Sequence, residues 1–323
     1  MPTSSVSLSL LSVISLLSFF VVLLTNKFSY KIKNGALLDI DFNKPQAFHQ
    51  NPTARSGGLA SFISLSLFFV LYYFLFEKVL IDYLVLTIAM FFLGFLEDLK
   101  LSLRAIYRLL IMSILLYFFI YFFSINIISL DLNFLNLLMK NWFFSSFFIL
   151  ICFLFIINGA NLVDGFNGLL TIHLLIINFI LLYINLNNGN QDLAMVITAQ
   201  IVVLISFLLF NFPKATLFLG DSGSYLFGSL VAYNIINTNN LNPQISSFFF
   251  CILLFYLFFE VFFSFFRKLY LKKSPLKPDR SHLHMLTYSF LANSLKFKDS
   301  NYLSSLLINA IYTSLILPAV FFQ

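Results

Sequence analysis

Charged residues are scarce in this chain. Only 10% of its 323 residues are Asp, Glu, Lys or Arg, whereas soluble globular domains carry about 25%. Hydrophobic residues make up 60%, Phe alone occurs 45 times, and the mean hydropathy is +0.94. Apolar runs long enough to cross the ~30 Å hydrocarbon layer of a bilayer recur from end to end. This composition excludes a soluble enzyme or binding module. It predicts an all-α, polytopic membrane helical bundle that forms a single domain over residues 1–323.

Cysteines and secretory-signal features are also few. Cys152 and Cys251 both fall within apolar runs, which is typical of packing residues and excludes a disulfide framework. The first 25 residues lack a basic n-region and an Ala-x-Ala cleavage site, so they predict an uncleaved first span. The formal charge of +6 and the pI near 9.2 could suggest nucleic acid. No basic arm or RNA-binding motif accompanies them, so we expect no nucleic-acid partner.

Ten apolar stretches predict about ten transmembrane helices. Their approximate limits are Val6 to Leu24, Leu59 to Phe76, Val79 to Leu96, Ala105 to Ser124, Trp142 to Ile157, Leu169 to Ile184, Leu193 to Phe210, Tyr225 to Ile236, Ile245 to Phe266 and Tyr302 to Phe321. The eighth is short unless it extends back toward Asp221.

The basic residues divide unequally between the two sides that alternating spans define. One side has only Lys78 and Lys140. The other has seventeen of the 19 Lys and Arg residues: Lys27, Lys31, Lys33, Lys44, Arg55, Lys100, Arg104, Arg108, Lys214, Arg267, Lys268, Lys272, Lys273, Lys277, Arg280, Lys296 and Lys298. Basic loops face the cytoplasm, so both termini are expected to face outward. Every polar motif of the chain lies on the predicted cytoplasmic side.

The most conspicuous motif is NGANLVDGFNGL, residues 158–169. It places four polar side chains at a strict spacing of three, namely Asn158, Asn161, Asp164 and Asn167. On a helix, residues three apart are neighbours, so the four are expected to form one stripe. The interspersed glycines would let a ligand approach the backbone closely. The alternative is a small-residue packing seam between helices.

Two adjacent carboxylates, Glu97 and Asp98, follow the third predicted span. Like charges side by side at a membrane surface are costly unless a cation or proton relieves them. A site shared with Mg²⁺ fits, because this ion commonly takes one or two carboxylates plus substrate phosphate. Lys100, Arg104 and Arg108 then recur every four residues as one basic stripe, which could grip a phosphorylated lipid or only contact headgroups.

A short run of small residues, GDSGS, precedes the eighth span. Gly220 and Ser222 would expose backbone N–H groups at a helix start, where a diphosphate can bind, and Asp221 could hold a metal. The run is not a Walker loop, because no Gly-Lys-Ser/Thr follows it. The alternative for Asp221 is a plain helix N-cap.

Two further loops carry candidate phosphate-binding groups. Arg280, His282 and His284 form a compact phosphate-binding or acid–base candidate, although two His at this spacing on a helix would point about 200° apart and make poor zinc ligands. In the first loop, Arg55 and His49 could contact a phosphate or nucleotide. The alternative for both loops is a solvated basic surface that sets the topology.

Two charged or titratable residues lie inside predicted spans. Glu260, near the inner end of the ninth span, is expected to pair with a basic residue or to be protonated, and nothing in the sequence supports a function for it. His173, inside the sixth span, is expected to be a packed histidine.

Taken in order, these loops resemble the polyprenyl-phosphate N-acetylhexosamine-1-phosphate transferases. Glu97 and Asp98 fall on the family's acidic pair, NGANLVDGFNGL on its Asn-x-x-Asn-x-x-Asp-Gly motif, GDSGS on its Gly-Asp-x-Gly-Ser motif, and HLHM on its His-x-His-His motif. The resemblance implies ten or eleven helices with a cytoplasmic-face active site. It also implies transfer of a sugar-1-phosphate from a UDP-sugar to undecaprenyl phosphate, with release of UMP and dependence on Mg²⁺ or Mn²⁺.

Four positions depart from the family pattern. Glu97 replaces the usual first Asp, a change associated with a subgroup that initiates surface polysaccharides such as lipopolysaccharide. Asn167 stands where many members have a second Asp. Met285 replaces the last His, which argues against the enzyme that loads the muramoyl-pentapeptide, and Gln46 stands where relatives of the subgroup often carry Arg.

The resemblance assigns roles to the candidate residues. Asp98, Glu97 and Asp221 are expected to be catalytic, with Asp221 and Asp98 as metal ligands. Substrate contacts are expected from Asn158, Asn161, Asp164, Asn167, Gly220, Ser222, Arg55, His49, Arg280, His282, His284, Lys100 and Arg104.

The expected reaction is one step of cell-wall or surface-polysaccharide biosynthesis. The enzyme would be a multi-pass protein of the bacterial inner membrane, with a possible homodimer, and would load HexNAc-1-phosphate from UDP-GlcNAc or a 6-deoxy relative. Two other functions remain open. One is a membrane transporter of nucleotide sugars or lipid-linked sugars, although the spans are nearly free of charge and no internal repeat is evident. The other is an inactive paralogue that acts as a binding partner.

Overall fold

Helices account for almost all of the secondary structure. The structure is a computed structural model that describes residues 4–31, 37–40, 52–101, 103–274 and 281–321. The elements are α1 (Ser4–Ser29), β1 (Leu38–Asp39), β2 (Thr53–Ala54), α2 (Gly57–Phe76), α3 (Ile81–Asp98), α4 (Ala105–Phe122), α5 (Asn133–Met139), α6 (Trp142–Val163), α7 (Leu169–Asn187), α8 (Gln191–Asn211), α9 (Gly220–Leu241), α10 (Ser247–Leu253), α11 (Phe255–Tyr270), α12 (Leu283–Ser289), the π-helical turn η2 (Phe290–Ser294) and α13 (Ser300–Phe321).

All ten predicted spans are helical, and the protein is an all-α, polytopic membrane protein. Within the described residues, seven helices are long and apolar enough to cross a membrane, and α10 with α11 would make an eighth. The two remaining long helices are more polar, since α3 carries three carboxylates and α9 is rich in Asn, Ser and Gly. The predicted number of about ten spans therefore stays a prediction.

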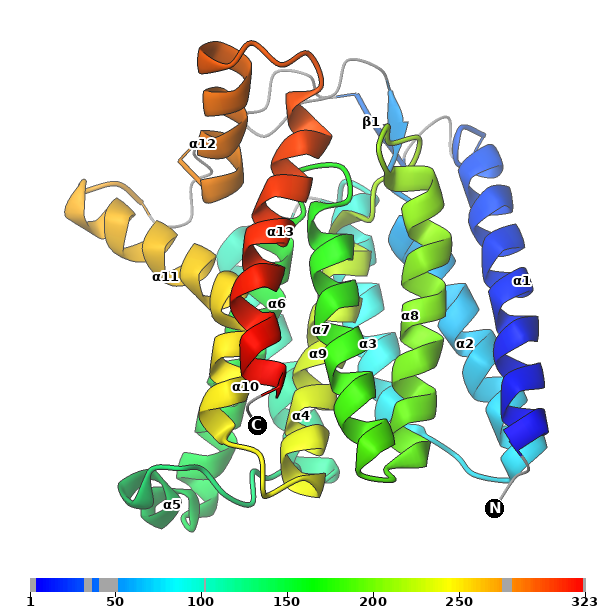
Figure 1. Ribbon diagram of the computed structural model, residues 1–323, viewed down its shortest axis with the longest axis vertical. Helices are drawn as coiled ribbons and strands as arrows, with labels where there is room; N and C mark the ends of the chain where they lie inside the picture. The colour runs from blue at the N-terminus through cyan, green and yellow to red at the C-terminus, as the bar shows by residue number, and fades with distance from the viewer. Residues whose placement is uncertain (1–3, 32–36, 41–51, 102, 275–280, 322–323) are drawn as a thin grey trace.

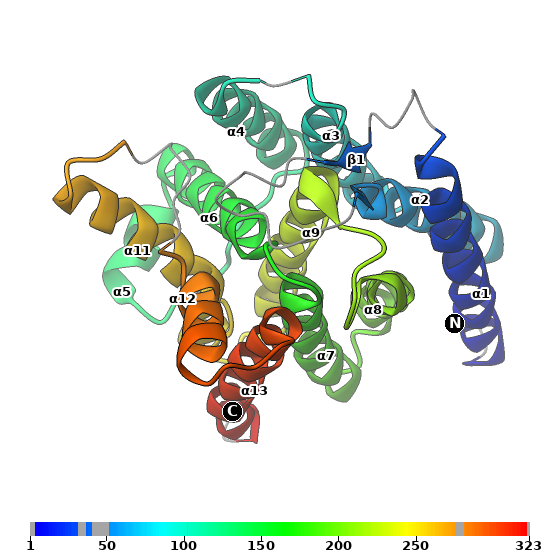
Figure 2. The same cartoon turned by 90° about the horizontal axis from the view of Figure 1, so that it is seen from above.

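Helix α9 can be polar because it is surrounded by other helices. It packs against α2, α3, α6, α7 and α8, and it lies near the middle of the bundle when seen from above (Figure 2). Its amides are satisfied by neighbouring side chains, since Asn234 donates to Gln200 at 2.8 Å and accepts from the Tyr83 hydroxyl at 3.0 Å. Lipid contact, which would require an apolar surface, falls to the outer helices instead.

The two ends of the bundle differ. Both chain termini and α5 lie in the half opposite β1 and α12 (Figure 1). Termini in the same half fit an even number of crossings and agree with the predicted arrangement, in which both termini lie away from the polar loops. The end that carries β1 is the end at which α3 and α6 finish and α9 begins, so the predicted motifs meet there.

The first loop is fastened to the start of α9. Strands β1 and β2 pair antiparallel, and the backbone N–H of Phe218 donates to the carbonyl of Ala54 at 2.7 Å. The N–H of Gly57 returns a bond to the carbonyl of Phe218 at 2.9 Å. These backbone bonds hold Arg55, which lies between Ala54 and Gly57, at a fixed position beside α9.

The ninth predicted span is broken into two helices. α10 and α11 meet at Leu254 with a bend of 66°, and α11 projects away from the rest of the bundle (Figure 1). Its exposed face is aromatic, whereas Glu260, Ser264 and Lys268 lie on its buried face. A helix that buries its polar residues and exposes its phenylalanines fits a lipid environment.

Candidate functional site

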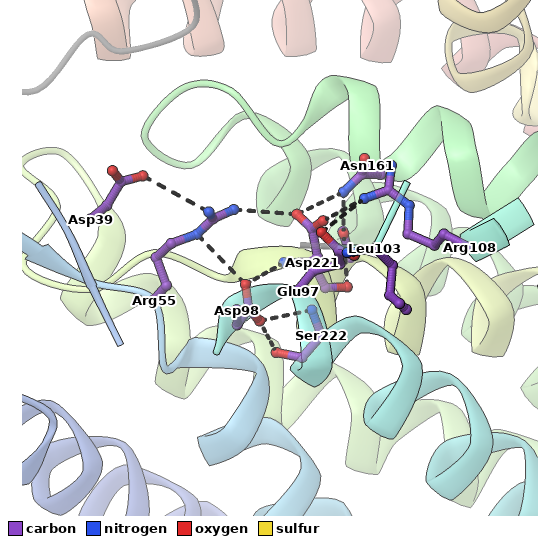
Figure 3. Close-up of polar contacts among 10 residues, drawn as sticks. Asp39, Arg55, Glu97, Asp98, Leu103, Arg108, Asn161, Asp221 and Ser222 are labelled. Atoms are coloured by element: carbon purple, nitrogen blue, oxygen red, sulfur yellow. Dashed lines mark hydrogen bonds and ion pairs between the residues drawn. The ribbon is translucent and has the colours of Figure 1, made fainter. Parts of the chain in front are cut away.

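The site is organised by Asp98, which caps the beginning of α9. One carboxylate oxygen of Asp98 accepts the backbone N–H of Asp221 at 3.0 Å (Figure 3). The other accepts the N–H of Ser222 at 2.9 Å and its hydroxyl at 2.5 Å. These are N–H groups of the first turn of a helix, which have no partner within the helix and favour a negative charge. Asp98 is 1% exposed. Its hydrogen bonds to the backbone of Asp221 and Ser222 hold Asp221 in place.

Glycines allow this close approach of α3 and α9. A Cβ on Gly94 would come within 2.4 Å of the carbonyl oxygen of Asp221. A Cβ on Gly220 would come within 2.6 Å of the Asp98 carboxylate, and the φ of Gly220 is +78°. Gly220 and Ser222 were predicted to expose backbone N–H groups to a diphosphate, but the N–H of Ser222 is bonded to Asp98 and that of Gly220 to Asp164. The structure gives Gly220 a steric role instead. Asp221 lies inside the first turn of α9, whose N-cap position is Leu219, so the plain N-cap interpretation of Asp221 is wrong.

Arg55 bridges the carboxylates from the side of the first loop. Its guanidinium lies 3.2 Å from Asp221, 3.6 Å from Asp98 and 4.0 Å from Asp39 (Figure 3). Burial by itself would lower the pKa of Arg55, but the surrounding carboxylates outweigh it and raise this pKa. Arg55 was selected from the sequence, whereas Asp39 was missed, because its only signal is the nearby Asp41 in the first loop.

Arg108 holds the site from the opposite side. It donates to Asp221 at 3.2 Å and lies 3.6 Å from Glu97 (Figure 3). Glu97 also accepts the backbone N–H of Leu103 at 3.0 Å, which fixes the loop that carries the basic stripe. Lys100 and Arg104, which were selected from this stripe, are exposed. A spacing of four identified the stripe but not the member that reaches the carboxylates.

The stripe can be tested by comparing two of its arginines. We expect Arg108→Gln to lower activity about 10–100-fold, because a hydrogen bond to a charged group contributes about 1.5–3 kcal/mol. Arg104→Gln should cost much less, since Arg104 is exposed. Initial rates of both variants, normalised to the amount of folded protein, check this. Equal losses of activity in the two variants would show that the contact of Arg108 with Asp221 does not contribute to the rate.

The polar stretch at residues 158–169 is not one helical stripe, and that prediction was wrong. α6 ends at Val163, so only Asn158 and Asn161 lie on the helix. Asn161 donates to Asp221 at 3.2 Å and to the hydroxyl of Ser224 at 3.1 Å, which brings it into the site (Figure 3). Asn158 donates to the carbonyl of Leu154, one turn earlier on its own helix.

Asn167 stabilises a turn and, among the described residues, makes no hydrogen bond to the carboxylates of the site. Its side chain donates to the carbonyl of Pro213 at 2.9 Å, and its backbone N–H donates to Asn301 at 2.9 Å. The absence of a carboxylate at this position therefore leaves the group around Asp221 intact. The helix-breaking turn separates Asn167 from Asn161, because Gly168 adopts a left-handed φ of +74° before α7 begins.

Asp164 follows directly after α6 and completes the acidic group. Burial raises the pKa of Asp164 to about 7; Arg55 opposes this, Asp221 and Asp98 add to it, and the N–H of Gly220 opposes it. A carboxyl with this pKa is part protonated near neutral pH. It can therefore exchange a proton or gain a full negative charge when a cation binds nearby.

The raised pKa of Asp164 predicts a pH-dependent cost of folding. The folded chain holds this proton more tightly than the unfolded chain, whose value is 3.8, so stability should fall as pH rises from about 4 to about 7. Asp164→Asn should remove the contribution of Asp164 to this loss of stability. Its Tm near pH 7 should rise by at least about 2–4 °C, the shift produced by about 1 kcal/mol of added stability. Melting curves in detergent without divalent cations check this, with exposed Asp192→Asn as the control. Parallel pH profiles for wild type and Asp164→Asn would contradict it.

The two histidines lie side by side, unlike the prediction from helical spacing. His282 precedes α12, and the rings of His282 and His284 are stacked with centroids 5.6 Å apart and planes 12° apart. Glu260 contacts His282 at 2.8 Å, which confirms that it pairs with a basic residue. His173 is fully buried beside Asn309 and Tyr312, which confirms a packed histidine. The other two candidates, His49 and Arg280, lie outside the described residues.

A divalent cation fits the charges of the site. Four carboxylates converge with two arginines at the ends of α3, α6 and α9, so negative charge is in excess. No three His, Cys, Asp or Glu side chains in the described ranges form a complete ligand set. Mg²⁺ does not require such a set, because it commonly takes one or two carboxylates and completes its shell with water and substrate phosphate. Of the two expected ligands, Asp221 is the more accessible, since its side chain is 17% exposed whereas that of Asp98 is 0% exposed.

Comparison with known proteins identifies the same region. The profile of Glycosyl transferase family 4 matches residues 80–239, which run from the start of α3 through α9. The chain is 35% identical to the undecaprenyl-phosphate alpha-N-acetylglucosaminyl 1-phosphate transferase of Thermotoga maritima over 137 residues, or 42% of this chain and 41% of the relative. The matched part thus spans about two fifths of that relative.

A second relative is covered more completely. The phospho-N-acetylmuramoyl-pentapeptide-transferase of Dictyoglomus turgidum is 30% identical over 239 residues, which are 69% of this chain and 73% of the relative. The two relatives act on different sugars by their names, so the similarity supports a shared type of transfer and leaves the sugar open.

Proposed function

Since this chain belongs to the polyprenyl-phosphate N-acetylhexosamine-1-phosphate transferase family, we propose that it transfers HexNAc-1-phosphate from a UDP-HexNAc to undecaprenyl phosphate. A lipid phosphate oxygen would form a bond to the sugar-linked phosphorus of the donor. The bond between the two donor phosphates would break, and UMP would leave. The product would be the lipid-linked first sugar of a cell-surface polysaccharide.

The placement of Asp221 is the observation that carries this proposal. Asp98 fixes the backbone on both sides of it, while Arg55, Arg108 and Asn161 contact its carboxylate. Such a group can bind a diphosphate in one orientation and neutralise the charge that develops during phosphoryl transfer. Bound Mg²⁺ would supply further charge neutralisation at the donor phosphates.

The roles of the two neighbouring carboxylates differ in this proposal. Asp98 is buried and uses both oxygens to hold α9, which supports a positioning role and disfavours direct attack on phosphorus. Glu97 is bound to Leu103 and lies beside Arg108, so it holds the arginine that faces Asp221. With Glu97 and Asp98 both engaged in this way, the arrangement favours one direct displacement over attack by either of these two carboxylates.

The active site would face the cytoplasm of a bacterial inner membrane. The seventeen basic residues on the side of the site support this orientation, because basic loops are retained in the cytoplasm. A cysteine placed at exposed Lys296 should react only with membrane-permeant reagents in intact cells. A cysteine at exposed Lys140 should react with impermeant ones.

An exchange assay tests the proposed reaction. Membranes with the chain, undecaprenyl phosphate, Mg²⁺, UDP-HexNAc and labelled UMP should return label to the nucleotide sugar, because the transfer is reversible. A panel of UDP-sugars then identifies the HexNAc, starting with UDP-GlcNAc. Transport of nucleotide sugar into vesicles without any exchange would overturn the proposal in favour of a transporter.

A further inference from the structure

Glu260 is a buried carboxylate that the transfer reaction leaves unexplained. It lies on the inward face of α11 and is fully buried. One of its oxygens lies 2.8 Å from Nδ1 of His282. The other accepts the backbone N–H of Leu283 at 3.0 Å and lies 4.0 Å from Nδ1 of His284. A charge buried in this helix is costly unless it is paired and hydrogen-bonded.

These contacts determine which nitrogen of His282 carries the proton. An ionised carboxylate only accepts hydrogen bonds, so pairing with ionised Glu260 requires Nδ1 of His282 to be the donor. The second bond, from Leu283, fixes the backbone between the two histidines. Glu260 thereby sets the tautomer and orientation of the first ring and the position from which the second ring projects. Carboxylates hold functional histidines in this way at many metal and catalytic sites.

His284 connects this pair with the acidic group. Its Nε2 lies 2.9 Å from the position that a Cβ on Gly165 would take, and its ring packs edge-on against Phe166 at 5.0 Å. Gly165 directly follows Asp164, whose pKa responds to Asp221 and Asp98. The side chain of His284 therefore touches the same turn that carries the last carboxylate of the site.

His284 has unused hydrogen-bonding capacity. It is 1% exposed, and neither ring nitrogen has a hydrogen-bond partner within the part of the chain that the structure describes. Burial lowers its pKa to about 4, with Glu260 opposing this and His282 adding to it, so the ring is neutral near pH 7. A neutral imidazole offers one donor and one acceptor. Buried polar atoms without a partner destabilise the folded chain, and a ligand that pairs with them removes this cost.

We propose that Glu260 is a positioning residue of the donor site, which acts by orienting His282 and placing His284 to hydrogen-bond an oxygen of the nucleotide diphosphate. This inference rests on the proposed function. It assigns to α11 a second role besides contact with lipid, because the helix with the exposed aromatic face also holds the histidine pair. Movement of α11 would then change how tightly the donor diphosphate is bound.

Glu260→Gln provides a sharp test, because Gln has one accepting oxygen and one donating NH₂ group. It cannot accept from Leu283 and from Nδ1 of His282 at the same time. We expect His282 to change from the Nδ1–H to the Nε2–H tautomer and KM for the UDP-sugar to rise about 10–100-fold, as is typical when the partner of a functional histidine is lost. A change in kcat should be smaller.

¹⁵N NMR of histidine-labelled protein in nanodiscs measures the tautomer. The chain has four histidines, so His282→Gln and His284→Gln assign the two signals. UMP with Mg²⁺ should shift the His284 signal in the wild type and not in Glu260→Gln. Ser264→Ala, one turn further along the same buried face of α11, serves as the matched control and should keep the wild-type KM and tautomer.

The outcomes separate this inference from the proposed function. If the wild type exchanges UMP but Glu260→Gln keeps the wild-type KM, the positioning role is overturned. If Glu260→Gln does not fold, the wild-type spectrum decides, and an Nε2–H tautomer of His282 or a His284 signal unaffected by UMP would overturn it. If the wild type shows no exchange, the proposed function fails by itself.

Discussion

Replacing Asp221 by Asn should lower the rate of sugar-phosphate transfer by at least about 10³-fold while the protein stays folded. Asp221 is where Arg55, Arg108 and Asn161 converge, and we expect it to be a ligand of the divalent cation. The amide keeps the size of the side chain but removes its charge. Loss of one well-placed electrostatic group in a phosphoryl or acyl transfer site costs about 10²–10³-fold, and loss of cation binding adds to this.

Asp192→Asn is the matched control for this substitution. Asp192 pairs with Lys78 at 2.7 Å, but it is 66% exposed and belongs to the opposite end of the bundle. Exposed ion pairs contribute about 0–1 kcal/mol, so activity and Tm should stay near wild type. Initial rates from the exchange assay and size-exclusion profiles in detergent measure both effects. Full activity of Asp221→Asn would remove Asp221 from the mechanism.

Gly220→Ala should reduce activity by about 10²-fold or more, although it adds only one methyl group. The φ of +78° is unfavourable for Ala, and the added Cβ would collide with the carboxylate of Asp98 at 2.6 Å. Relief of this contact requires the Asp98 carboxylate or the start of α9 to shift, which disturbs the hydrogen bonds that place Asp221. A displacement of about 1 Å in such a site can cost about 10²-fold in rate.

Gly189→Ala separates the steric effect from backbone strain. Gly189 has nearly the same φ, +75°, but nothing lies within 4 Å of its Cβ position. Both substitutions therefore carry the left-handed cost of about 1–2 kcal/mol, and only Gly220→Ala crowds the site. Rates and Tm of the two variants give the comparison. Equal activities would show that contact between α3 and α9 is not required for transfer.

The sequence correctly predicted which motifs form the site. The acidic pair, Asn161, Asp164 and the GDSGS run do converge, and the profile match covers all of them. Asn158 and Asn167 were selected by the same spacing but bond to backbone carbonyls instead. A regular spacing predicts a common face only if the helix continues, and α6 stops between these residues.

Contacts made across long sequence distances were not predictable. Arg108 and Arg104 look alike in the sequence, yet only the packing of α4 beside α3 decides which one meets Asp221. Glu260 looked like an isolated charge, because His282 is 22 residues away and approaches only after the bend between α10 and α11. Hydropathy alone also did not give the number of spans. α9 is shielded from lipid by the surrounding helices, so it can be polar and still lie within the bundle.

The amino-acid sequence by itself determined that this protein is a helical membrane bundle with its polar motifs on one side. A membrane-spanning segment must be a long apolar helix, and the charges of the loops set its orientation. Both properties can therefore be read from the composition of short stretches of sequence. Only the tertiary structure decided that Asp98 holds the start of α9, that Asp221 lies between two arginines, and that Glu260 supports the histidines. The first two depend on how closely α3 and α9 approach, which small residues such as Gly94 and Gly220 at their contact permit. The third depends on the bend between α10 and α11.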